Sequence, residues 1–171
     1  MPTPSEQELL HQLHGLRSTG FADKLAHHAT AHGLPVPYFY AIASRETNCV
    51  NELGDFKSDG AHGVGIVQID IQHAIARQAR DSGSWETNPD PLIEVGAQML
   101  ASNISTAQAQ LPGLTEEQAQ KVAASGYNAG IGRAIAASKE GDSDKPTTGH
   151  DYGADVMART AIFAKLIAEN A

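Results

Sequence analysis

The sequence lacks most of the features that cross-link a protein or anchor it in a membrane. Cys49 is the only cysteine among 171 residues, which excludes an intrachain disulfide. No apolar run approaches the roughly 18 residues that a membrane-spanning helix needs. The opening segment, MPTPSEQELL, has neither the basic nor the apolar part of a secretory signal peptide. We therefore expect a protein that is made in the cytoplasm, does not insert into a membrane and is stabilised by packing alone.

Positive charge and aromatic side chains are also scarce. Twelve Lys and Arg residues stand against 20 Asp and Glu residues, and the net charge of −8 argues against nucleic acid as a partner. Hydrophobic residues make up 41% of the chain but aromatic residues only 5%, which fits a core built from small side chains. The length predicts a single domain, residues 1–171, and we expect it to act as a monomer.

The hydrophobic pattern is mostly helical, with one irregular insert. Thr3-Pro4-Ser5-Glu6 resembles a helix start with Thr3 as the N-cap. The predicted helices cover residues 4–14, 21–32, 38–49, 71–80, 90–110, 116–127 and 151–169. In the insert, residues 51–70, an Asp59-Gly60 turn and an apolar run from Val64 to Ile69 predict a small hairpin whose second strand is that run.

Glu46 is the first candidate for chemistry. It lies near the end of a predicted helix, and the residues three or four positions away on the same face are apolar or nearly so: Ile42, Ala43, Cys49 and Val50. Burial on that face would raise the pKa of the carboxyl, so that it stays protonated near neutral pH and can act as a general acid. A glutamate that turns to solvent or pairs with Arg45 is the alternative.

Two aspartates follow in the irregular insert. Asp59 begins the predicted turn and Asp70 ends the predicted strand, and each also fits a purely structural role. Gly63 and Gly65 would leave the strand surface without side chains, so that a ligand can approach the backbone. Gln68 would share a strand face with Asp70 by the period of two. One proton-donating carboxyl opposite water-holding carboxylates is what an inverting glycosidase requires.

Four motifs, taken together, resemble the goose-type lysozymes and the related lytic transglycosylases, a group similar to glycoside hydrolase family 23. The motifs occur in the family's order: Ser44-Arg45-Glu46, then Gly63-Val64-Gly65-Ile66-Val67-Gln68-Ile69-Asp70, then Tyr127-Asn128-Ala129-Gly130, and last Asp151-Tyr152-Gly153-Ala154-Asp155-Val156-Met157-Ala158-Arg159. The resemblance covers residues 38–163, preceded by N-terminal helices in residues 1–37. It implies a mostly α, lysozyme-like α+β fold, in which a helical domain and a small β-hairpin line a glycan-binding cleft.

The resemblance also implies residue roles. Glu46 matches the general acid, and Asp59 and Asp70 match the acidic positions that hold or activate water. Gly63, Gly65, Gln68, Tyr127, Asn128 and Tyr152 match substrate-binding positions or neighbours of the catalytic groups. The implied reaction is hydrolysis, with inversion, of the β-1,4 bond between N-acetylmuramic acid and N-acetylglucosamine in peptidoglycan. The alternatives are a lytic transglycosylase that leaves 1,6-anhydro ends, and a peptidoglycan-binding module without activity.

The chain departs from the family's vertebrate members because it cannot form their disulfides. This points to a phage or bacterial member, such as an endolysin that reaches the cell wall after holin-type release or by another export route. Peptidoglycan strands are the expected partner, and a protein inhibitor or an immunity protein is a second.

No metal or cofactor is expected. His28 and His32 stand four residues apart on one helical face, but three histidines on a helix are typical of a mildly basic surface. Residues 55–60 resemble the start of a calcium loop, but Lys57 occupies a ligand position and Ile66 replaces the closing glutamate. Cys49 with His62 as a nucleophile and base is a third alternative function, a peptidase or amidase.

Overall fold

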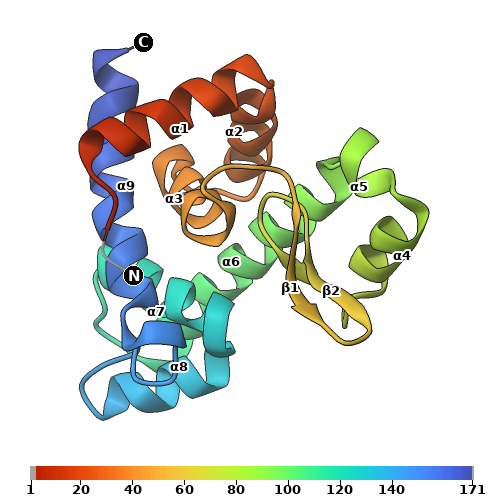
Figure 1. Cartoon of the computed structure of the whole chain (residues 1–171). Coiled ribbons are helices and arrows are strands. Elements are labelled where there is room, and N and C mark those ends of the chain that lie inside the picture. Colours follow the sequence, from red (N-terminus) through yellow and green to blue (C-terminus); the bar gives the residue numbers. More distant parts are fainter. Residues whose placement is uncertain (1–2, 171) are drawn as a thin grey trace.

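The computed structural model describes residues 3–170 and is mainly helical, as predicted (Figure 1). The α-helices within this part of the chain are α1 (Glu6–Ser18), α2 (Phe21–Ala31), α3 (Val36–Thr47), α4 (Ala74–Ser82), α5 (Ser84–Thr87), α6 (Asp90–Gln110), α7 (Glu116–Ala129), α8 (Ile131–Lys139) and α9 (Tyr152–Glu169). The strands are β1 (Leu53–Lys57), β2 (Gly60–Val64) and β3 (Ile69–Asp70), and a short 3₁₀ helix, η1, covers Thr148–His150. The α+β fold class is confirmed.

Helix α3 forms the centre of the molecule. Its side chains are buried around nearly its whole circumference, because α2 and α9 pack against it from different sides (Figure 1). Helix α1 begins two residues later than the sequence suggested. Ser5, not Thr3, is the N-cap, and it forms a reciprocal capping box with Glu8. The Thr3 hydroxyl instead donates to Asp155 in α9, at 2.6 Å.

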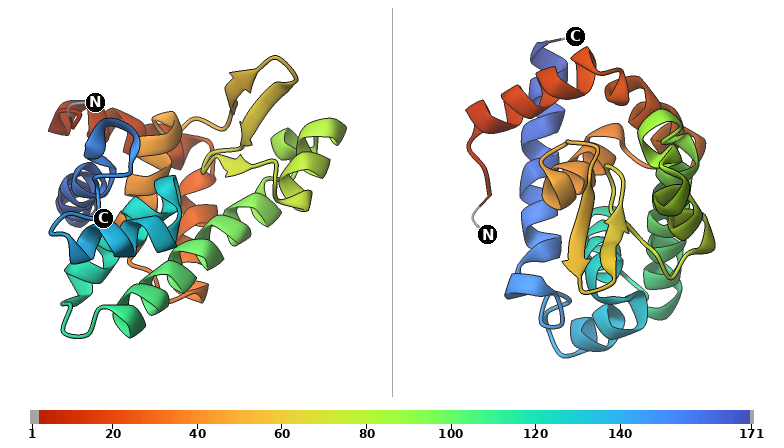
Figure 2. Two further views of the ribbon diagram at one scale, coloured as in Figure 1. Left: turned by 90° about the horizontal axis from the view of Figure 1, so that it is seen from below. Right: turned by 45° about the vertical axis from the view of Figure 1, so that its right-hand side comes forward.

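The three strands form an antiparallel sheet in the order β1-β2-β3, and the β1–β2 hairpin projects from the helical body (Figure 2). The prediction of one strand from Val64 to Ile69 was wrong. The chain turns between these residues, since Gly65 and Gln68 adopt left-handed backbone angles with φ of 82° and 49°. The apolar Ile66 and Val67 in this turn are buried in the core, which explains why the run resembled a strand.

The remaining helices complete two lobes on either side of α3. Helices α4 and α5 lie beside the sheet, α6 runs from there across the molecule, and α7 and α8 lie on the other side (Figures 1 and 2). The sequence did not predict α8. It packs through a small second core that it shares with α6 and α7, formed by Ala107, Val122, Ala134 and Ile135. None of the helices in the described residues is both long and apolar enough to cross a membrane.

Candidate active site

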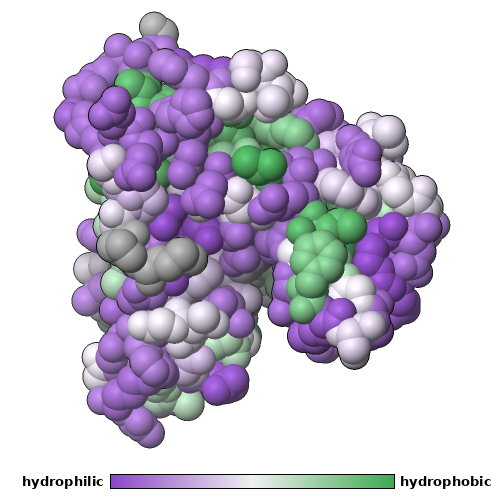
Figure 3. Space-filling view, in the orientation of Figure 1, coloured by the Kyte–Doolittle hydropathy of each residue, from purple (hydrophilic) through white to green (hydrophobic). Residues whose placement is uncertain are grey.

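A furrow separates the lobe with the sheet from the lobe with α7 and α8 (Figure 3). A cavity of about 330 Å³ opens between these lobes. Its walls are formed by Glu46, Asp55, His62, Gly63, Gln68, Asp70, Tyr127, Asn128 and Thr148. Residues that are up to about 100 positions apart in sequence therefore line one cavity. Three of the lining side chains, those of Glu46, Asp55 and Asp70, carry carboxyl groups.

Glu46 reaches this cavity because α3 ends directly after it. Asn48 and Cys49 have left-handed backbone angles, with φ of 52° and 65°, which turn the chain out of the helix. Asparagine tolerates this conformation better than most residues. The turn leaves Glu46 in the last helical turn, at the point where the chain leaves the core for the hairpin.

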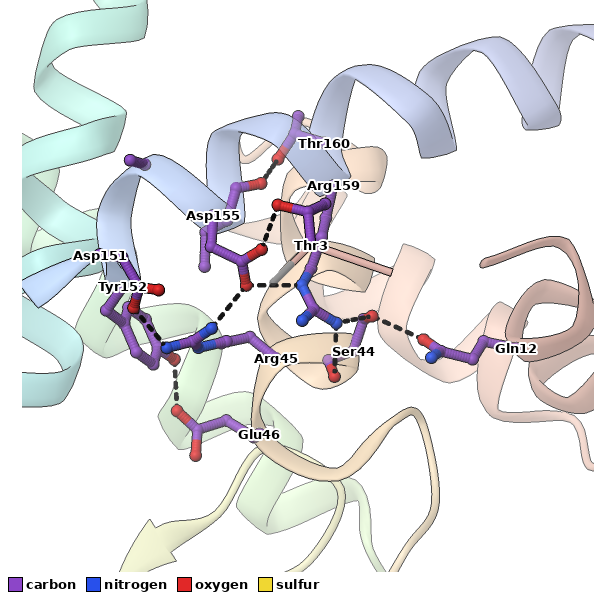
Figure 4. A network of polar contacts seen from close by, with 12 residues as sticks. Thr3, Gln12, Ser44, Arg45, Glu46, Asp151, Tyr152, Asp155, Arg159 and Thr160 are labelled. Atoms are coloured by element: carbon purple, nitrogen blue, oxygen red, sulfur yellow. Dashed lines mark hydrogen bonds and ion pairs between the residues drawn. The ribbon is translucent and has the colours of Figure 1, made fainter. Parts of the chain in front are cut away.

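The carboxyl of Glu46 is poised to carry a proton. Burial raises its pKa to about 7, although a hydrogen bond from Tyr152 and the charge of Arg45 act in the opposite direction. The Tyr152 hydroxyl donates this hydrogen bond to Oε1 of Glu46 (Figure 4). Burial also raises the pKa of Tyr152 well above its ordinary value, so the phenol remains a donor. Near neutral pH, Glu46 therefore exists in both protonation states, as a general acid requires.

The N-terminus of α9 places Tyr152 beside Glu46. The buried carboxylate of Asp144 accepts hydrogen bonds from the backbone N–H groups of Gly153 and Ala154, at 2.6 and 2.9 Å, and so caps the helix. The guanidinium of Arg45 lies 5.3 Å from the centre of the Tyr152 ring, within the range of a cation–π contact. Contacts from Asp144 and from Arg45 in α3 thus fix the position of Tyr152, which in turn hydrogen-bonds to Glu46.

A buried ion network supports this arrangement from behind. The Asp155 carboxylate pairs with both Arg45 and Arg159 at 2.8 Å (Figure 4). Arg45 also pairs with Asp151, and Arg159 donates to the backbone carbonyl and the hydroxyl of Ser44. The network therefore joins the first turns of α9 to the residues directly before Glu46 in α3.

Asp70 faces the same cavity from β3. The backbone N–H of Gln72 donates to its Oδ1 at 2.7 Å, and no residue of 3–170 hydrogen-bonds to Oδ2. Because one oxygen is fixed and the other is open, the carboxylate is suited to hold a water molecule.

Gln68 lines the cavity, but not from a strand face as predicted. Its side-chain amide donates to the carbonyls of Glu52 and Gly65, at 3.0 and 2.8 Å, and closes the turn before β3. Its Oε1 lies over the paired glycines Gly54 and Gly63, where an added Cβ would come within 2.2 and 2.1 Å of it. These glycines therefore make room for Gln68 and do not by themselves expose backbone to a ligand.

Tyr127 and Asn128 form the opposite wall, at the end of α7. The Tyr127 hydroxyl donates to the carbonyl of Val67 at 2.7 Å and ties the two lobes together across the cavity. The side-chain oxygen of Asn128 accepts the N–H of Thr148 at 2.9 Å and so positions η1 at the rim. Thr148 was not singled out in the sequence, where it belongs to a polar loop without a motif.

Two of the predicted site residues lie elsewhere. Asp59 is at the tip of the hairpin, where its side chain is 68% exposed and accepts a hydrogen bond from His62 at 2.8 Å. It is not among the residues that form the cavity wall. Gly65 is buried against α6, where an added Cβ would meet the Leu92 side chain at 3.1 Å. Its place in the motif is explained by packing and by a φ of 82°.

Asp55 and His62 are cavity residues that the sequence analysis did not assign. Asp55 was considered only as part of a calcium loop, and His62 only as a partner for Cys49. The β1–β2 hairpin turns at Ser58-Asp59, one residue before the predicted Asp59-Gly60 turn, and this register places Asp55 and His62 opposite each other. A turn at Asp59-Gly60 would have placed Lys57 opposite His62, so the predicted turn did not indicate this pair.

The structure does not support a cysteine nucleophile. Cys49 is buried against the side chain of Gln12 and the carbonyl of Tyr40, at 3.6 and 3.9 Å. Burial raises the pKa of its thiol to about 12, so the thiolate is not formed near neutral pH. His62 belongs to the hairpin and bonds to Asp59 and Lys57.

The contact between Tyr152 and Glu46 gives a first testable expectation. In Tyr152→Phe the hydrogen bond that favours ionised Glu46 is lost, so the pKa of Glu46 should rise above about 7. The pH at which Glu46 ionises, followed by NMR of a 13C-labelled carboxyl, should move to a higher value. Tyr40→Phe is the matched control, since it removes a buried hydroxyl that donates to the Ala22 carbonyl, away from Glu46. An unchanged titration in Tyr152→Phe would contradict the assignment.

Comparison of the sequence with known proteins identifies the family to which this chain is similar. Residues 19–166 match the family described as Lysozyme g. The chain is 28% identical to Lysozyme g of Cyprinus carpio over 123 residues, which are 72% of this chain and 61% of that protein. It is 29% identical to Lysozyme g of Epinephelus coioides over 150 residues, which are 84% of this chain and 74% of that protein. Since the family match extends over most of its length, the chain belongs to the goose-type lysozyme (Lysozyme g) family.

Proposed function

We propose that this protein is a muramidase that hydrolyses the β-1,4 bond between N-acetylmuramic acid and N-acetylglucosamine in peptidoglycan. One observation carries the proposal. A glutamate with a pKa of about 7, Glu46, and a carboxylate, Asp70, line the same cavity in a chain of the Lysozyme g family. An acid and a water-holding carboxylate on opposite sides of the scissile bond are the groups that inverting glycosidases use.

The proposed reaction uses two proton transfers. Protonated Glu46 donates its proton to the glycosidic oxygen, and the bond from this oxygen to C1 of the muramic acid breaks. Water held by Asp70 attacks C1 from the opposite face and gives up a proton to a carboxylate, so that the new hydroxyl has the inverted configuration. Asp59, which matches the second acidic position of the family, is proposed to contribute from the hairpin tip. Gln68, Tyr127 and Asn128 would contact the sugars.

A lytic transglycosylase is the second candidate. Such an enzyme needs the acid but no attacking water, because the C6 hydroxyl of the sugar itself attacks C1. Asp70 favours hydrolysis, since a carboxylate with one open oxygen beside the cavity is suited to hold water. A catalytically silent binding module is the third candidate, and the raised pKa of Glu46 argues against it.

Mass spectrometry of the fragments released from purified peptidoglycan tests the proposal. Hydrolysis should give reducing muropeptides that have gained one water per cut. Fragments lighter by that water would have 1,6-anhydro ends and would establish a transglycosylase. Protein that sediments with the wall without releasing fragments would establish a binding module.

The rate of hydrolysis should depend on pH through Glu46. The general acid is active when protonated, so the rate should be highest below pH 7 and fall as the pH rises through about 7, approaching tenfold per pH unit. Release of reducing ends, measured between pH 5 and 9 at constant ionic strength, checks this limb. A rate that still rises between pH 7 and 9 would contradict Glu46 as the acid.

Its biological setting is part of the same proposal. With one cysteine, the chain cannot form the disulfides that the resemblance attributes to vertebrate members, so we infer a phage or bacterial lytic enzyme. Lysis of permeabilised bacteria by added protein, compared with intact bacteria, measures whether it needs help to reach the wall.

A further inference from the structure

Asp55 is a carboxylate of the cavity to which neither the motifs nor the family resemblance gives a role. It is the middle residue of β1, and it forms part of the same wall as His62 and Gly63. The cavity thus has three carboxyl groups, those of Glu46, Asp55 and Asp70. The spacing in sequence had suggested Asp59 as the third.

The backbone at Asp55 is built differently from the rest of the hairpin. The β1–β2 register pairs Gly54 with Gly63 and Phe56 with Ala61, but it skips the rung of Asp55 and His62 between them. Asp55 adopts a left-handed conformation with φ of 48°, which is rare for a residue with a side chain in the middle of a strand. The one interrupted rung supplies two side chains to the cavity wall, and strained residues of this kind gather at functional sites.

Lys57 and His62 make different contacts with Asp55 and Asp59, and these contacts distinguish the two carboxylates as proton acceptors. Lys57 Nζ lies 3.1 Å from Oδ2 of Asp55 and donates to Nδ1 of His62 at 3.2 Å. Because Nδ1 accepts this hydrogen bond, Nε2 of His62 carries the ring hydrogen and donates a hydrogen bond to Asp59. This bond lowers the pKa of Asp59 and makes it a weaker proton acceptor. Among residues 3–170, nothing hydrogen-bonds to Oδ1 of Asp55.

We propose that Asp55 is a further catalytic carboxylate, which holds the attacking water together with Asp70 and accepts its proton. The inference rests on the proposed muramidase function and deepens it. As the water oxygen bonds to C1, one water proton passes to Asp55, while the leaving oxygen takes the proton of Glu46. Asp55 then returns its proton to solvent and Glu46 regains one, so the cycle closes without any other reactant.

The experiment uses two variants that keep the backbone conformation, Asp55→Asn and Asp55→Gly, since asparagine and glycine both accept positive φ. Turnover is measured on soluble glycan oligomers prepared from peptidoglycan, so that kcat and KM are separated. We expect kcat to fall about 10²-fold in both variants while KM changes little. Asp81→Asn, an acid-to-amide change at an exposed residue paired with Arg80, is the control and should keep full activity.

Azide makes the test specific for a base. It attacks C1 without losing a proton, so in Asp55→Gly added azide should restore turnover and yield a glycosyl azide of inverted configuration. Activity of both Asp55 variants within about threefold of the unmodified protein would overturn the proposal. So would a loss in Asp55→Gly that azide does not restore, or a loss found only in Asp59→Asn. If the unmodified protein releases no reducing ends, the muramidase function itself fails.

Discussion

Glu46→Gln should lower the rate of peptidoglycan hydrolysis at least about 10³-fold, within the range that general acid catalysis contributes. Glutamine keeps the size of the side chain and can still accept the hydrogen bond from Tyr152, but it has no proton to give to the leaving oxygen. Release of reducing ends at pH 6, where glutamic acid at this site is mostly protonated, measures the effect. Full activity of the variant would exclude Glu46 as the acid.

The same variant should be as stable as the unmodified protein, or more stable, and the difference should depend on pH. The pKa of Glu46 is about 7 in the folded state against 4.5 for an ordinary glutamate, so between these values the folded state binds the extra proton. The free energy of unfolding of the unmodified protein therefore falls as the pH rises from 4.5 to 7, by about 3 kcal/mol as an order of magnitude. Glutamine does not titrate and avoids this loss.

Urea unfolding at pH 4.5 and pH 8 measures this difference and serves as the folding control. At pH 4.5 the two proteins should unfold at similar urea concentrations, whereas at pH 8 Glu46→Gln should require more urea. An inactive variant that is also less stable at pH 8 would mean that the loss of activity reflects damage to the fold.

Much of the helical architecture could be predicted from local signals. The capping box at Thr115 and Gln118 and the glycine after α2 mark helix ends that the structure confirms. The interval between Val64 and Ile69 could not be predicted in this way. Its apolar side chains are buried because they fill the core between the sheet and α6, and this requirement for burial resembles that of a strand. The left-handed angles of Gly65 and Gln68 are set by the tertiary structure.

The residues around the candidate cavity were predictable to the extent that they belong to motifs. Glu46, Asp70, Gln68, Tyr127 and Asn128 line one cavity, although they come from three separate stretches of the chain. Asp55 was not predictable, since its side chain reaches the cavity only through a distortion of β1. Spacing along a chain cannot show which carboxylate of a hairpin faces the cleft when the backbone departs from a regular strand.

The partners of Arg45, the residue before Glu46, could not be predicted from the sequence either. The sequence placed Arg45 next to Glu46 and suggested that the two might pair. In the structure the Arg45 guanidinium pairs with Asp155 and Asp151 instead and lies over the Tyr152 ring (Figure 4), although its charge still lowers the pKa of Glu46. The arginine of the Ser-Arg-Glu motif is thus a structural residue that connects α3 with α9.

Asp155→Asn should therefore be the most destabilising single polar change in the site region. The Asp155 carboxylate is 3% exposed and pairs with two guanidiniums that are almost equally buried, those of Arg45 and Arg159. An amide of the same shape leaves both positive charges without their shared counter-ion. Removing one partner of a buried ion pair costs about 3–5 kcal/mol of the free energy of unfolding. Urea unfolding at pH 7 measures the loss.

Glu6→Gln is the matched control for this prediction. Glu6 in α1 pairs with Lys165 in α9 at 2.8 Å, so it also links α9 to the N-terminal helices, but both side chains are about half exposed. Solvent screens such a pair, and its loss should leave the unfolding curve nearly unchanged. Asp155→Asn and Glu6→Gln make the same chemical change in two ion pairs of the same helix, so a difference between them measures the effect of burial. Equal unfolding curves for the two variants would show that the buried network stabilises the fold no more than the exposed ion pair does.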